Sequence, residues 1–138
     1  MATAFTHIAL HVADLDACIN FYTDYCAMSL VHDRLDAGKR IVWLAEPGRA
    51  DDFIIVLIPG GSRRQQKDDD FSHFGFALPS RAAVDAIARR ASEAGILAWP
   101  TRDEAAPVGY YCGLRDPDGN LVEFSFDQPI RTAAGPIS

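Results

Sequence analysis

Two histidines occupy matching places in a repeated pattern of this chain. His7 and His73 each follow a phenylalanine and a hydroxyl residue, and a helix-start residue, Asp14 or Ser80, lies seven positions after each histidine. Both pairs of positions are 66 residues apart. A repeat of this kind indicates two copies of one supersecondary unit. We therefore expect the two histidines at equivalent strand positions, where paired units can bring them into one cavity.

A carboxylate near the end of the second copy is the third candidate ligand. Glu123 lies inside the apolar strand segment Leu121–Phe126, directly after the turn signal Asp116–Asn120. An unpaired charge in the middle of such a strand would be costly to bury. A lone histidine on a strand is most often a core or surface residue, but repetition beside this carboxylate favours metal ligation. His7, His73 and Glu123 are therefore a possible metal site.

Length, composition and charge restrict the classes of function. The chain of 138 residues suits one compact domain or two small modules with a shared core, and its hydrophobic share of 49% is that of an ordinary globular protein. The formal net charge of −6 disfavours nucleic acid and anionic membranes as partners. Residues 1–10 lack the pattern of a secretory signal, and no apolar run is long enough to span a bilayer. We expect a cytoplasmic protein.

The three cysteines are expected to be reduced. Cys18 and Cys26 are predicted on one helix, about 12 Å apart along its axis and beyond disulfide reach. Both are expected to pack against the sheet. Cys112 lies on a strand close to Glu123, and Arg115 is the only nearby cation that could lower its pKa. We do not expect a catalytic thiolate.

Hydrophobic periodicity predicts the same element order, βαβββ, in both halves. The strands are expected at Phe5–Val12, Ser29–Asp33, Arg40–Leu44 and Phe53–Ile58, and then at Phe71–Leu78, Ile96–Trp99, Gly109–Leu114 and Leu121–Phe126. The helices are expected from Asp14 to Cys26 and from Ser80 to Ala94, and Arg102–Pro107 is expected to be a loop. The predicted domains are a first module at 1–61, a polar linker at 62–70, a second module at 71–128, and a tail at 129–138 that crosses the cavity or frays.

Three segments carry a resemblance to a known family. They are His7–Leu15 running into Phe21 and Tyr22, Phe71–Phe76, and Asp116–Glu123. In these the chain resembles the vicinal oxygen chelate superfamily, which includes glyoxalase I, extradiol dioxygenases, fosfomycin-resistance thiol transferases and bleomycin-binding proteins. The resemblance implies an α+β fold in which two βαβββ modules pair into a half-open eight-stranded barrel. It also implies a divalent metal on the concave face and, usually, a homodimer.

The resemblance also implies a ligand set. The metal-binding positions of the family fall on His7, His73 and Glu123, and Glu123 is in addition a candidate catalytic residue. Four-ligand members carry a further Glu or Gln in the last strand of the first module, where Val56 stands in this sequence. The missing ligand counts against glyoxalase I and the related epimerases. Two histidines and one carboxylate leave about three coordination positions open to a substrate that chelates Fe(II), Mn(II), Ni(II) or Zn(II).

Other residues are candidates for roles around that metal. His11 shares a strand face with His7, so it is either a hydrogen-bonding group or general base, or a polar residue at the cavity rim. By the family's geometry Tyr111 faces the cavity, where its hydroxyl could donate to a metal-bound oxygen or its ring could simply pack. Gly113 would leave room for a bulky substrate. Val56, Tyr111 and Gly113 are the predicted substrate-binding residues.

The chain departs from the branches with the same ligand count. Extradiol enzymes place a tyrosine ten residues before the glutamate, where Gly113 stands here, and a histidine follows the second ligand, whereas none follows His73 here. Fosfomycin transferases carry a threonine where Ala9 stands and a lysine before the last strands, whereas no lysine follows position 67 here. No known reaction of the superfamily is therefore assigned.

Three functions stay open. The first is a metal-dependent enzyme that chelates two adjacent oxygens of a small substrate, with dioxygenase-like chemistry for Fe(II) and lyase-like or isomerase-like chemistry for Mn(II), Ni(II) or Zn(II). The second is a drug-binding resistance protein of the bleomycin type that performs no chemistry. The third is a metal-free scaffold. Retention of all three ligand positions favours the enzyme.

Overall fold

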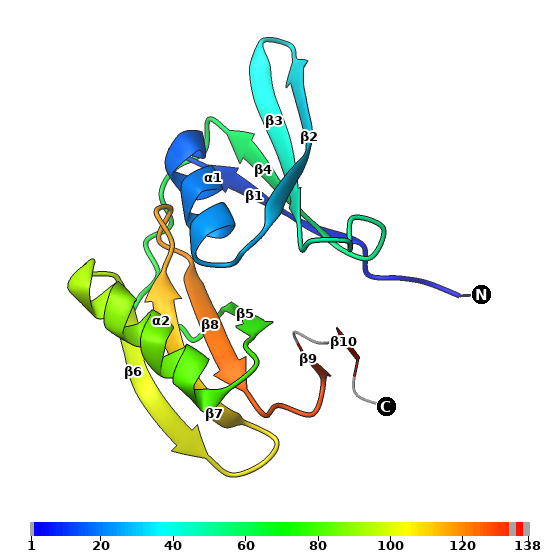
Figure 1. The fold of residues 1–138 in the computed structure, drawn as a ribbon. Coiled ribbons are helices and arrows are strands. Elements are labelled where there is room, and N and C mark those ends of the chain that lie inside the picture. The colour runs from blue at the N-terminus through cyan, green and yellow to red at the C-terminus, as the bar shows by residue number, and fades with distance from the viewer. Residues whose placement is uncertain (1, 133–134, 137–138) are drawn as a thin grey trace. The chain divides into compact units, whose positions relative to one another are not determined.

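The computed structural model describes residues 2–132 and 135–136 and divides the chain into two compact units, Met1–Arg64 and Gln65–Ser138 (Figure 1). The boundary falls inside the polar stretch 62–70. Each unit has one four-stranded sheet and one helix. Of the predicted tail 129–138, residues 133–134 and 137–138 lie outside the described part of the chain.

The first unit follows the predicted order βαβββ. Its elements are β1 (His7–Val12), α1 (Leu15–Asp24), β2 (Ser29–Asp36), β3 (Lys39–Ala45) and β4 (Ile54–Pro59). The sheet order is β1-β4-β3-β2, with β1 parallel to β4 and the other pairs antiparallel. Strand β1 alternates as predicted: His7, Ala9 and His11 are exposed, whereas Val12 on the other face is fully buried.

Helix α1 begins as predicted and ends earlier than predicted. The side chain of Asp14 accepts a hydrogen bond from the amide of Ala17 and so caps the first turn. The last helical residue is Asp24, and Ala27 adopts a positive φ of 53°. The prediction that Cys26 lies on the helix is therefore wrong, because the chain has already turned toward β2. Cys18 is buried, whereas Cys26 is half-buried.

The second unit repeats this order. Its elements are β5 (Phe74–Ala77), α2 (Arg81–Glu93), β6 (Leu97–Glu104), β7 (Gly109–Arg115) and β8 (Leu121–Phe126), in the sheet order β5-β8-β7-β6. Two short strands follow and pair with each other, β9 (Arg131–Thr132) and β10 (Gly135–Pro136). Helix α2 packs on β6 and β7, and Ser80 caps it by accepting from the amide of Ala83 (Figure 1). Gly95, with φ of 74°, follows the helix and ends it.

Two boundaries of the second unit differ from the prediction. The expected loop at Arg102–Pro107 is wrong in its first half, because Arg102 and Asp103 pair with Tyr111 and Tyr110 and extend β6 to Glu104. Strand β5 begins at Phe74, so His73 lies immediately before the strand instead of within it.

The turn before β8 is fixed by a buried carboxylate. Asp116 is 3% exposed, and its Oδ1 accepts hydrogen bonds from the amides of Asp118 and Asn120 at 2.9 and 2.8 Å. Its Oδ2 accepts from the side-chain amide of Asn120 at 3.0 Å. The turn that the sequence signalled is therefore built around Asp116, and it sets where β8 begins.

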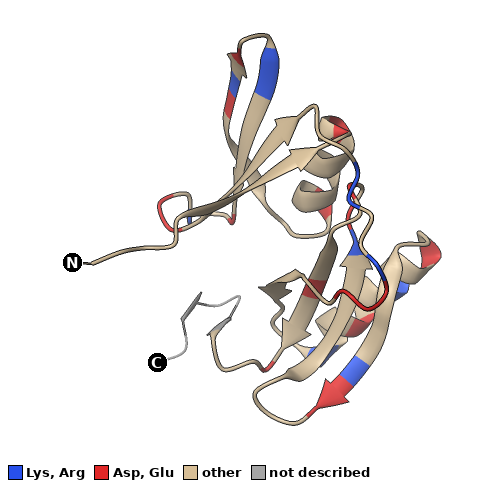
Figure 2. Cartoon of the chain, turned by 180° about the vertical axis from the view of Figure 1, so that it is seen from behind, with Lys and Arg blue, Asp and Glu red and all other residues tan. Residues whose placement is uncertain are grey.

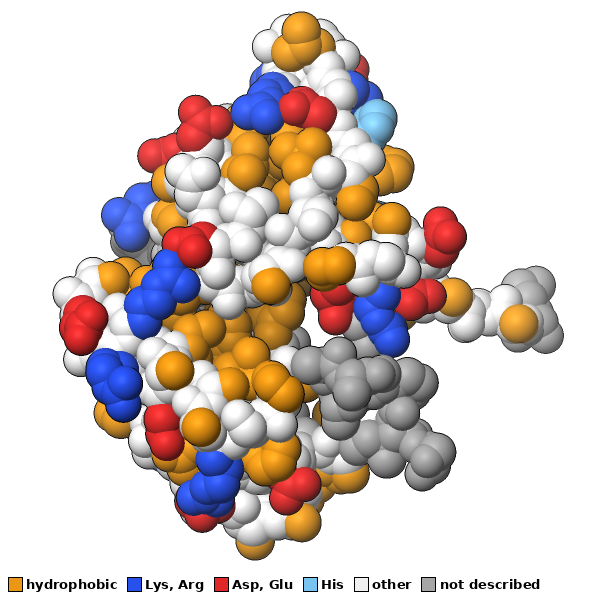
Figure 3. Space-filling model, in the orientation of Figure 1, with side chains coloured by type: hydrophobic (Ala, Val, Ile, Leu, Met, Phe, Trp, Pro, Cys, Tyr) orange, Lys and Arg blue, Asp and Glu red, His pale blue; other side chains and the backbone are white. Residues whose placement is uncertain are grey.

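Charged residues are placed mostly outside the sheet centres. They gather in the connection between the units, at the tip of the β2–β3 hairpin and at the end of β6 (Figure 2). Glu123 is the only charged residue of β8. On the face seen in Figure 3, acidic and basic side chains are interspersed, so this face has no continuous basic patch of the kind that binds a nucleic-acid backbone. No helix in the described residues is long and apolar enough to cross a membrane.

Candidate metal centre

The second unit brings two of the three predicted ligands together. Nε2 of His73 lies 3.9 Å from Oε1 of Glu123. Parallel pairing of β5 with β8 places Gly75 opposite Glu123, so the histidine two residues earlier comes beside the carboxylate. Two ligands that each lie about 2.1 Å from one metal ion are at most about 4.2 Å apart. The separation falls within this limit, and an approach of about 0.5 Å would bring the two atoms to the spacing of a tetrahedral site.

A hydrogen bond fixes the state of the His73 ring. Its Nδ1 lies 2.7 Å from the carbonyl oxygen of Phe71. A carbonyl can only accept, so Nδ1 carries the hydrogen and, in the neutral ring, Nε2 keeps its lone pair. Metal-binding histidines usually donate their other ring hydrogen in this way, which fixes the tautomer and the direction of the ring. His73 is therefore arranged to bind a metal through Nε2.

Burial disfavours the negative charge of the Glu123 carboxylate. It is 9% exposed, and burial raises its pKa, while His73 and a hydrogen bond from Gln128 act in the opposite direction. The Gln128 amide donates to Oε2 at 3.4 Å. A Cβ at position 75 would come within 3.2 Å of Oε2, so Gly75 leaves the carboxylate its space. A buried carboxylate beside an imidazole nitrogen is a donor set that fits a divalent cation.

His7 belongs to the first unit. It is exposed at the start of β1, and its Nδ1 lies 2.9 Å from the hydroxyl of Thr6. Within residues 2–132 and 135–136 no three His, Cys, Asp or Glu side chains form a group that could hold a metal. His7 as the third ligand therefore stays a prediction.

Strand register supports the match between Val56 and Glu123. Val56 pairs with Ala9, two residues after His7, just as Glu123 pairs with Gly75, two residues after His73. The position in the first unit that corresponds to Glu123 is thus a half-buried valine with no donor atom. Substrate contact by Val56 stays a prediction.

The space above Gly113 is filled by protein. A Cβ at Gly113 would lie 2.7 Å from the indole of Trp99, which pairs with it across β6 and β7. The indole also contacts His73 and Tyr111 edge-on, with ring centres 5.3 and 6.2 Å apart. The expectation that Gly113 leaves room for a bulky substrate is therefore replaced: Gly113 makes room for Trp99, which forms a wall beside His73.

Tyr111 and His11 are the two further candidates for catalytic roles. Tyr111 is buried, and its hydroxyl donates to the carboxylate of Glu104. This hydrogen bond, followed by burial, raises the pKa of Tyr111. Its hydrogen is thus already engaged. His11 lies four residues along β1 from His7, a separation of about 13 Å at the usual strand rise. The catalytic roles suggested for both residues remain predictions.

Cys112 is a protonated core thiol. Burial, then the charges of Glu123 and Asp85, raise its pKa from 9.0 to about 12. In native protein at about pH 8, we expect Cys112→Ala to leave the number of thiols that react with Ellman's reagent unchanged, whereas in unfolded protein the variant loses one. A lower count for the native variant would contradict this.

The Cys112 thiol ionises at a lower pH in the unfolded protein than in the native protein. The free energy of unfolding that this thiol contributes is therefore lost as pH rises from about 9 to about 12.

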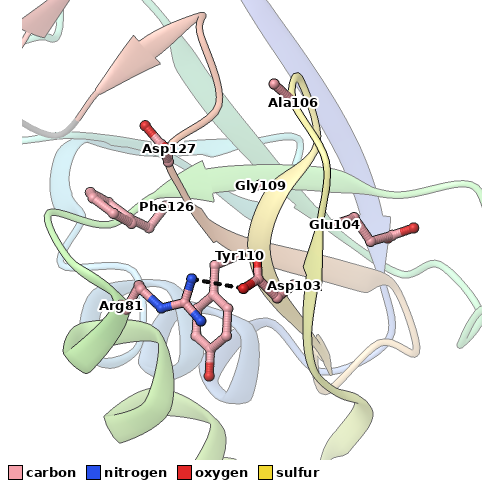
Figure 4. A pocket seen from close by; sticks show the side chains of 8 residues that line it. All are labelled: Arg81, Asp103, Glu104, Ala106, Gly109, Tyr110, Phe126 and Asp127. Carbon is pink, nitrogen blue, oxygen red and sulfur yellow. Dashed lines mark ion pairs between the residues drawn. The ribbon is translucent and has the colours of Figure 1, made fainter.

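A separate cavity lies elsewhere in the second unit. It measures about 180 Å³ and is lined by Arg81, Asp103, Glu104, Ala106, Gly109, Tyr110, Phe126 and Asp127 (Figure 4). Arg81 pairs with Asp103 at 3.0 Å and lies 4.0 Å above the ring of Tyr110. The guanidinium is already occupied by these two partners, and the lining includes none of the predicted site residues. We do not assign the function to this cavity.

Sequence reasoning missed several residues around the ligand pair. The sequence analysis assigns no role to Gln128, the last residue of the predicted second module, or to Glu104, which lies in the expected loop Arg102–Pro107. Glu104 could have been found by extending the predicted strand at Ile96–Trp99 to the residues that pair with β7. No pattern in the sequence points to the contact of Gln128 with Glu123, because Gln128 lies after the end of β8, where strand alternation no longer predicts the direction of a side chain.

Comparisons with known proteins identify the family of this chain. Residues 4–124 match the model of the Glyoxalase/Bleomycin resistance protein/Dioxygenase superfamily. The chain is 61% identical over 130 residues to the uncharacterized protein PA2024 of Pseudomonas aeruginosa. The aligned region covers 94% of this chain and 93% of that protein.

Solved structures show the same fold. A glyoxylase/bleomycin resistance protein/dioxygenase domain from Frankia sp. EAN1pec has a TM-score of 0.71 at 22% identity, covering 93% of this chain and all of that one. A variant of the fosfomycin resistance protein FosX from Listeria monocytogenes, complexed with Mn(II) and dihydroxypropylphosphonic acid, has a TM-score of 0.73 at 19% identity, covering 93% and 95%. The predicted α+β fold class of two βαβββ modules is confirmed. The chain belongs to the Glyoxalase/Bleomycin resistance protein/Dioxygenase superfamily.

Proposed function

We propose that this protein is a divalent-metal-dependent enzyme that binds two adjacent oxygens of a small substrate. His73 and Glu123 of the second unit, with His7 of a first unit, would hold the ion, which is Fe(II), Mn(II), Ni(II) or Zn(II). The observation that carries the proposal is the pairing of Nε2 of His73 with the buried carboxylate of Glu123 at 3.9 Å. The first unit would come from the same chain or from a second copy in a homodimer.

The bound ion would supply Lewis-acid chemistry, stabilising negative charge on substrate oxygens. The chain's own residues have supporting tasks. The carbonyl of Phe71 holds the ring of His73 in the tautomer that binds metal, and Gln128 steadies the carboxylate of Glu123. The indole of Trp99 shields the ligand pair on one side.

The ligand count supports substrate chelation. With Val56 at the place of a fourth ligand, three protein ligands leave about three positions of an octahedral ion for substrate and water. The Mn(II) complex of the structurally similar FosX variant supports the choice of metals. Oxygen chemistry with Fe(II), or lyase-like or isomerase-like chemistry with the other ions, are the reaction classes that this arrangement suits.

A non-catalytic protein of the bleomycin-resistance type is the second candidate. The family includes proteins of that description, and the rings of Phe71 and Trp99, with centres 6.5 Å apart, lie close enough to each other to line a binding surface. Such a protein would bind its drug equally well with and without metal. The enzyme requires the ion for substrate binding.

Substrate chelation can be tested with a matched pair of probes. We expect catechol, which has two adjacent oxygens, to lower the water-proton relaxation rate of Mn(II)-loaded protein, because it displaces bound water. Phenol, with one oxygen, should have a much smaller effect. Equal effects of catechol and phenol, or no effect of either, would contradict chelation. Binding of catechol that is unchanged by removal of the metal would favour the drug-binding alternative.

A further inference from the structure

Gln66 stands out in the polar connection between the units. This connection was expected to be a solvated linker, and the neighbouring Gln65 is indeed exposed, whereas Gln66 is half-buried. The Gln66 amide nitrogen donates to the carbonyl oxygens of Asp70 and Ser72, at 2.5 and 2.7 Å. Its amide oxygen accepts from Arg115 at 3.0 Å. All three hydrogen-bonding positions used by this side chain are thus directed at two other segments of the same unit.

The first of these segments leads directly to His73. Asp70 accepts a hydrogen bond from the amide of Ser72 at 3.0 Å, which closes a tight local turn. The carbonyl of Phe71 accepts from Nδ1 of His73, while the next carbonyl, that of Ser72, is held by Gln66. Gln66 holds the carbonyl of Ser72 in place, and this restrains the adjacent carbonyl of Phe71, which orients the imidazole of His73.

The second segment leads to Glu123. Arg115 is the last residue of β7, and its guanidinium also donates to the carbonyl of Gly119 at 3.3 Å, within the turn that starts β8. Gln66 thus connects, through Arg115, the turn before the strand of Glu123 with the residues before His73. The Gln66 side chain thus links residues that are far apart in the sequence.

We propose that Gln66 is a positioning residue for His73. It fixes the backbone at residues 70–72, and thereby the tautomer of His73 and the direction of Nε2 toward Glu123. The part of the proposal that concerns metal affinity rests on the proposed function; the part that concerns the tautomer does not. Loss of a group that orients a metal ligand typically lowers metal affinity by about 10–100-fold.

Three variants separate the contacts of Gln66. Gln66→Ala removes all of them. Gln66→Glu keeps an acceptor for Arg115 but cannot donate to the carbonyls of Asp70 and Ser72. Gln65→Ala changes the exposed neighbour of the same residue type and serves as the matched control. Urea unfolding curves establish the conditions under which each variant is folded.

The first readout is the tautomer of His73 in metal-free protein, from the ¹⁵N shifts of its ring under those folded conditions. We expect Nδ1–H in the parent protein and in Gln65→Ala, and a mixture of tautomers in both Gln66 variants. The second readout is Mn(II) affinity by calorimetry, which should fall about 10–100-fold in both Gln66 variants and stay unchanged in the control.

An unchanged tautomer in the folded Gln66 variants would overturn the proposal, and so would a shift of equal size in Gln65→Ala. A merely structural linker residue would lower stability without moving the ring shifts, which also counts against the proposal. If the parent protein binds none of Fe(II), Mn(II), Ni(II) and Zn(II), the proposed function fails, while the ¹⁵N shifts of the metal-free protein still decide the role of Gln66.

Discussion

Replacement of either ligand in the second unit is expected to remove tight binding of divalent cations. Glu123→Gln replaces the buried carboxylate by a neutral amide, and His73→Ala removes the nitrogen that faces it at 3.9 Å. Each change deletes a direct metal bond, so affinity should fall by more than the roughly 10–100-fold that is typical when a supporting residue is lost. His7→Ala should have an effect of similar size if the first unit provides the third ligand.

Calorimetric titration with Mn(II) measures this effect. The matched controls are His32→Ala, a histidine of the first unit whose ring centre lies 4.7 Å from that of Trp43, and Glu93→Gln, an exposed glutamate at the end of α2. Both should bind Mn(II) as tightly as the parent protein. Unchanged affinity in Glu123→Gln and His73→Ala would place the metal elsewhere, and equal losses in the controls would show that binding is nonspecific.

The Asp116→Ala variant is expected to lower the free energy of unfolding by about 3 kcal/mol. The substitution deletes three buried hydrogen bonds to a carboxylate and leaves the amides of Asp118 and Asn120 without their acceptor. Hydrogen bonds to charged groups contribute roughly 1.5–3 kcal/mol each, and buried donors without a partner add a penalty, although local rearrangement recovers part of the loss. The corresponding decrease in Tm is roughly 10 °C.

Urea unfolding followed by tryptophan fluorescence measures the change. Asp116→Asn retains one acceptor oxygen and should lie between Asp116→Ala and the parent. Asp68→Ala, at an exposed position in the polar connection, should change stability by less than about 0.5 kcal/mol. If Asp116→Ala were as stable as Asp68→Ala, the turn would not depend on the buried carboxylate.

The order of the elements and the starts of both helices could be predicted from local signals. Asp14 and Ser80 have side chains that cap a helix only when the helix begins at the next residue, so each sets a start. The match of Val56 with Glu123 comes from the family resemblance, and strand register supports it: Val56 pairs with Ala9, two residues after His7, and Glu123 pairs with Gly75, two residues after His73.

Ends of elements were harder to predict, because they depend on partners that are distant in sequence. Arg102 and Asp103 are polar and resemble loop residues, yet their backbones are held in β6 by pairing with β7. The end of α1 before Cys26 has a local cause instead: Ala27 adopts a positive φ, which no residue type in that segment signals.

The surroundings of the candidate ligands depend on such distant pairings as well. Gly113 indicated open space, but the side chain that fills it, Trp99, comes from the neighbouring strand and is brought there by a register shift in β6. The role of Gln66 could not be predicted for a similar reason. Its segment is polar throughout, and only the fold shows that the Gln66 side chain joins Arg115 to the backbone before His73.

The most direct test of a metal-dependent function is the metal content of the protein, measured by elemental analysis after purification without added metal. We expect about one Fe, Mn, Ni or Zn ion per chain, with the ion lost from His73→Ala and from Glu123→Gln. A protein without metal, whose Tm is also not raised by any of these four cations, would contradict a metal-dependent function and favour a metal-free binding protein.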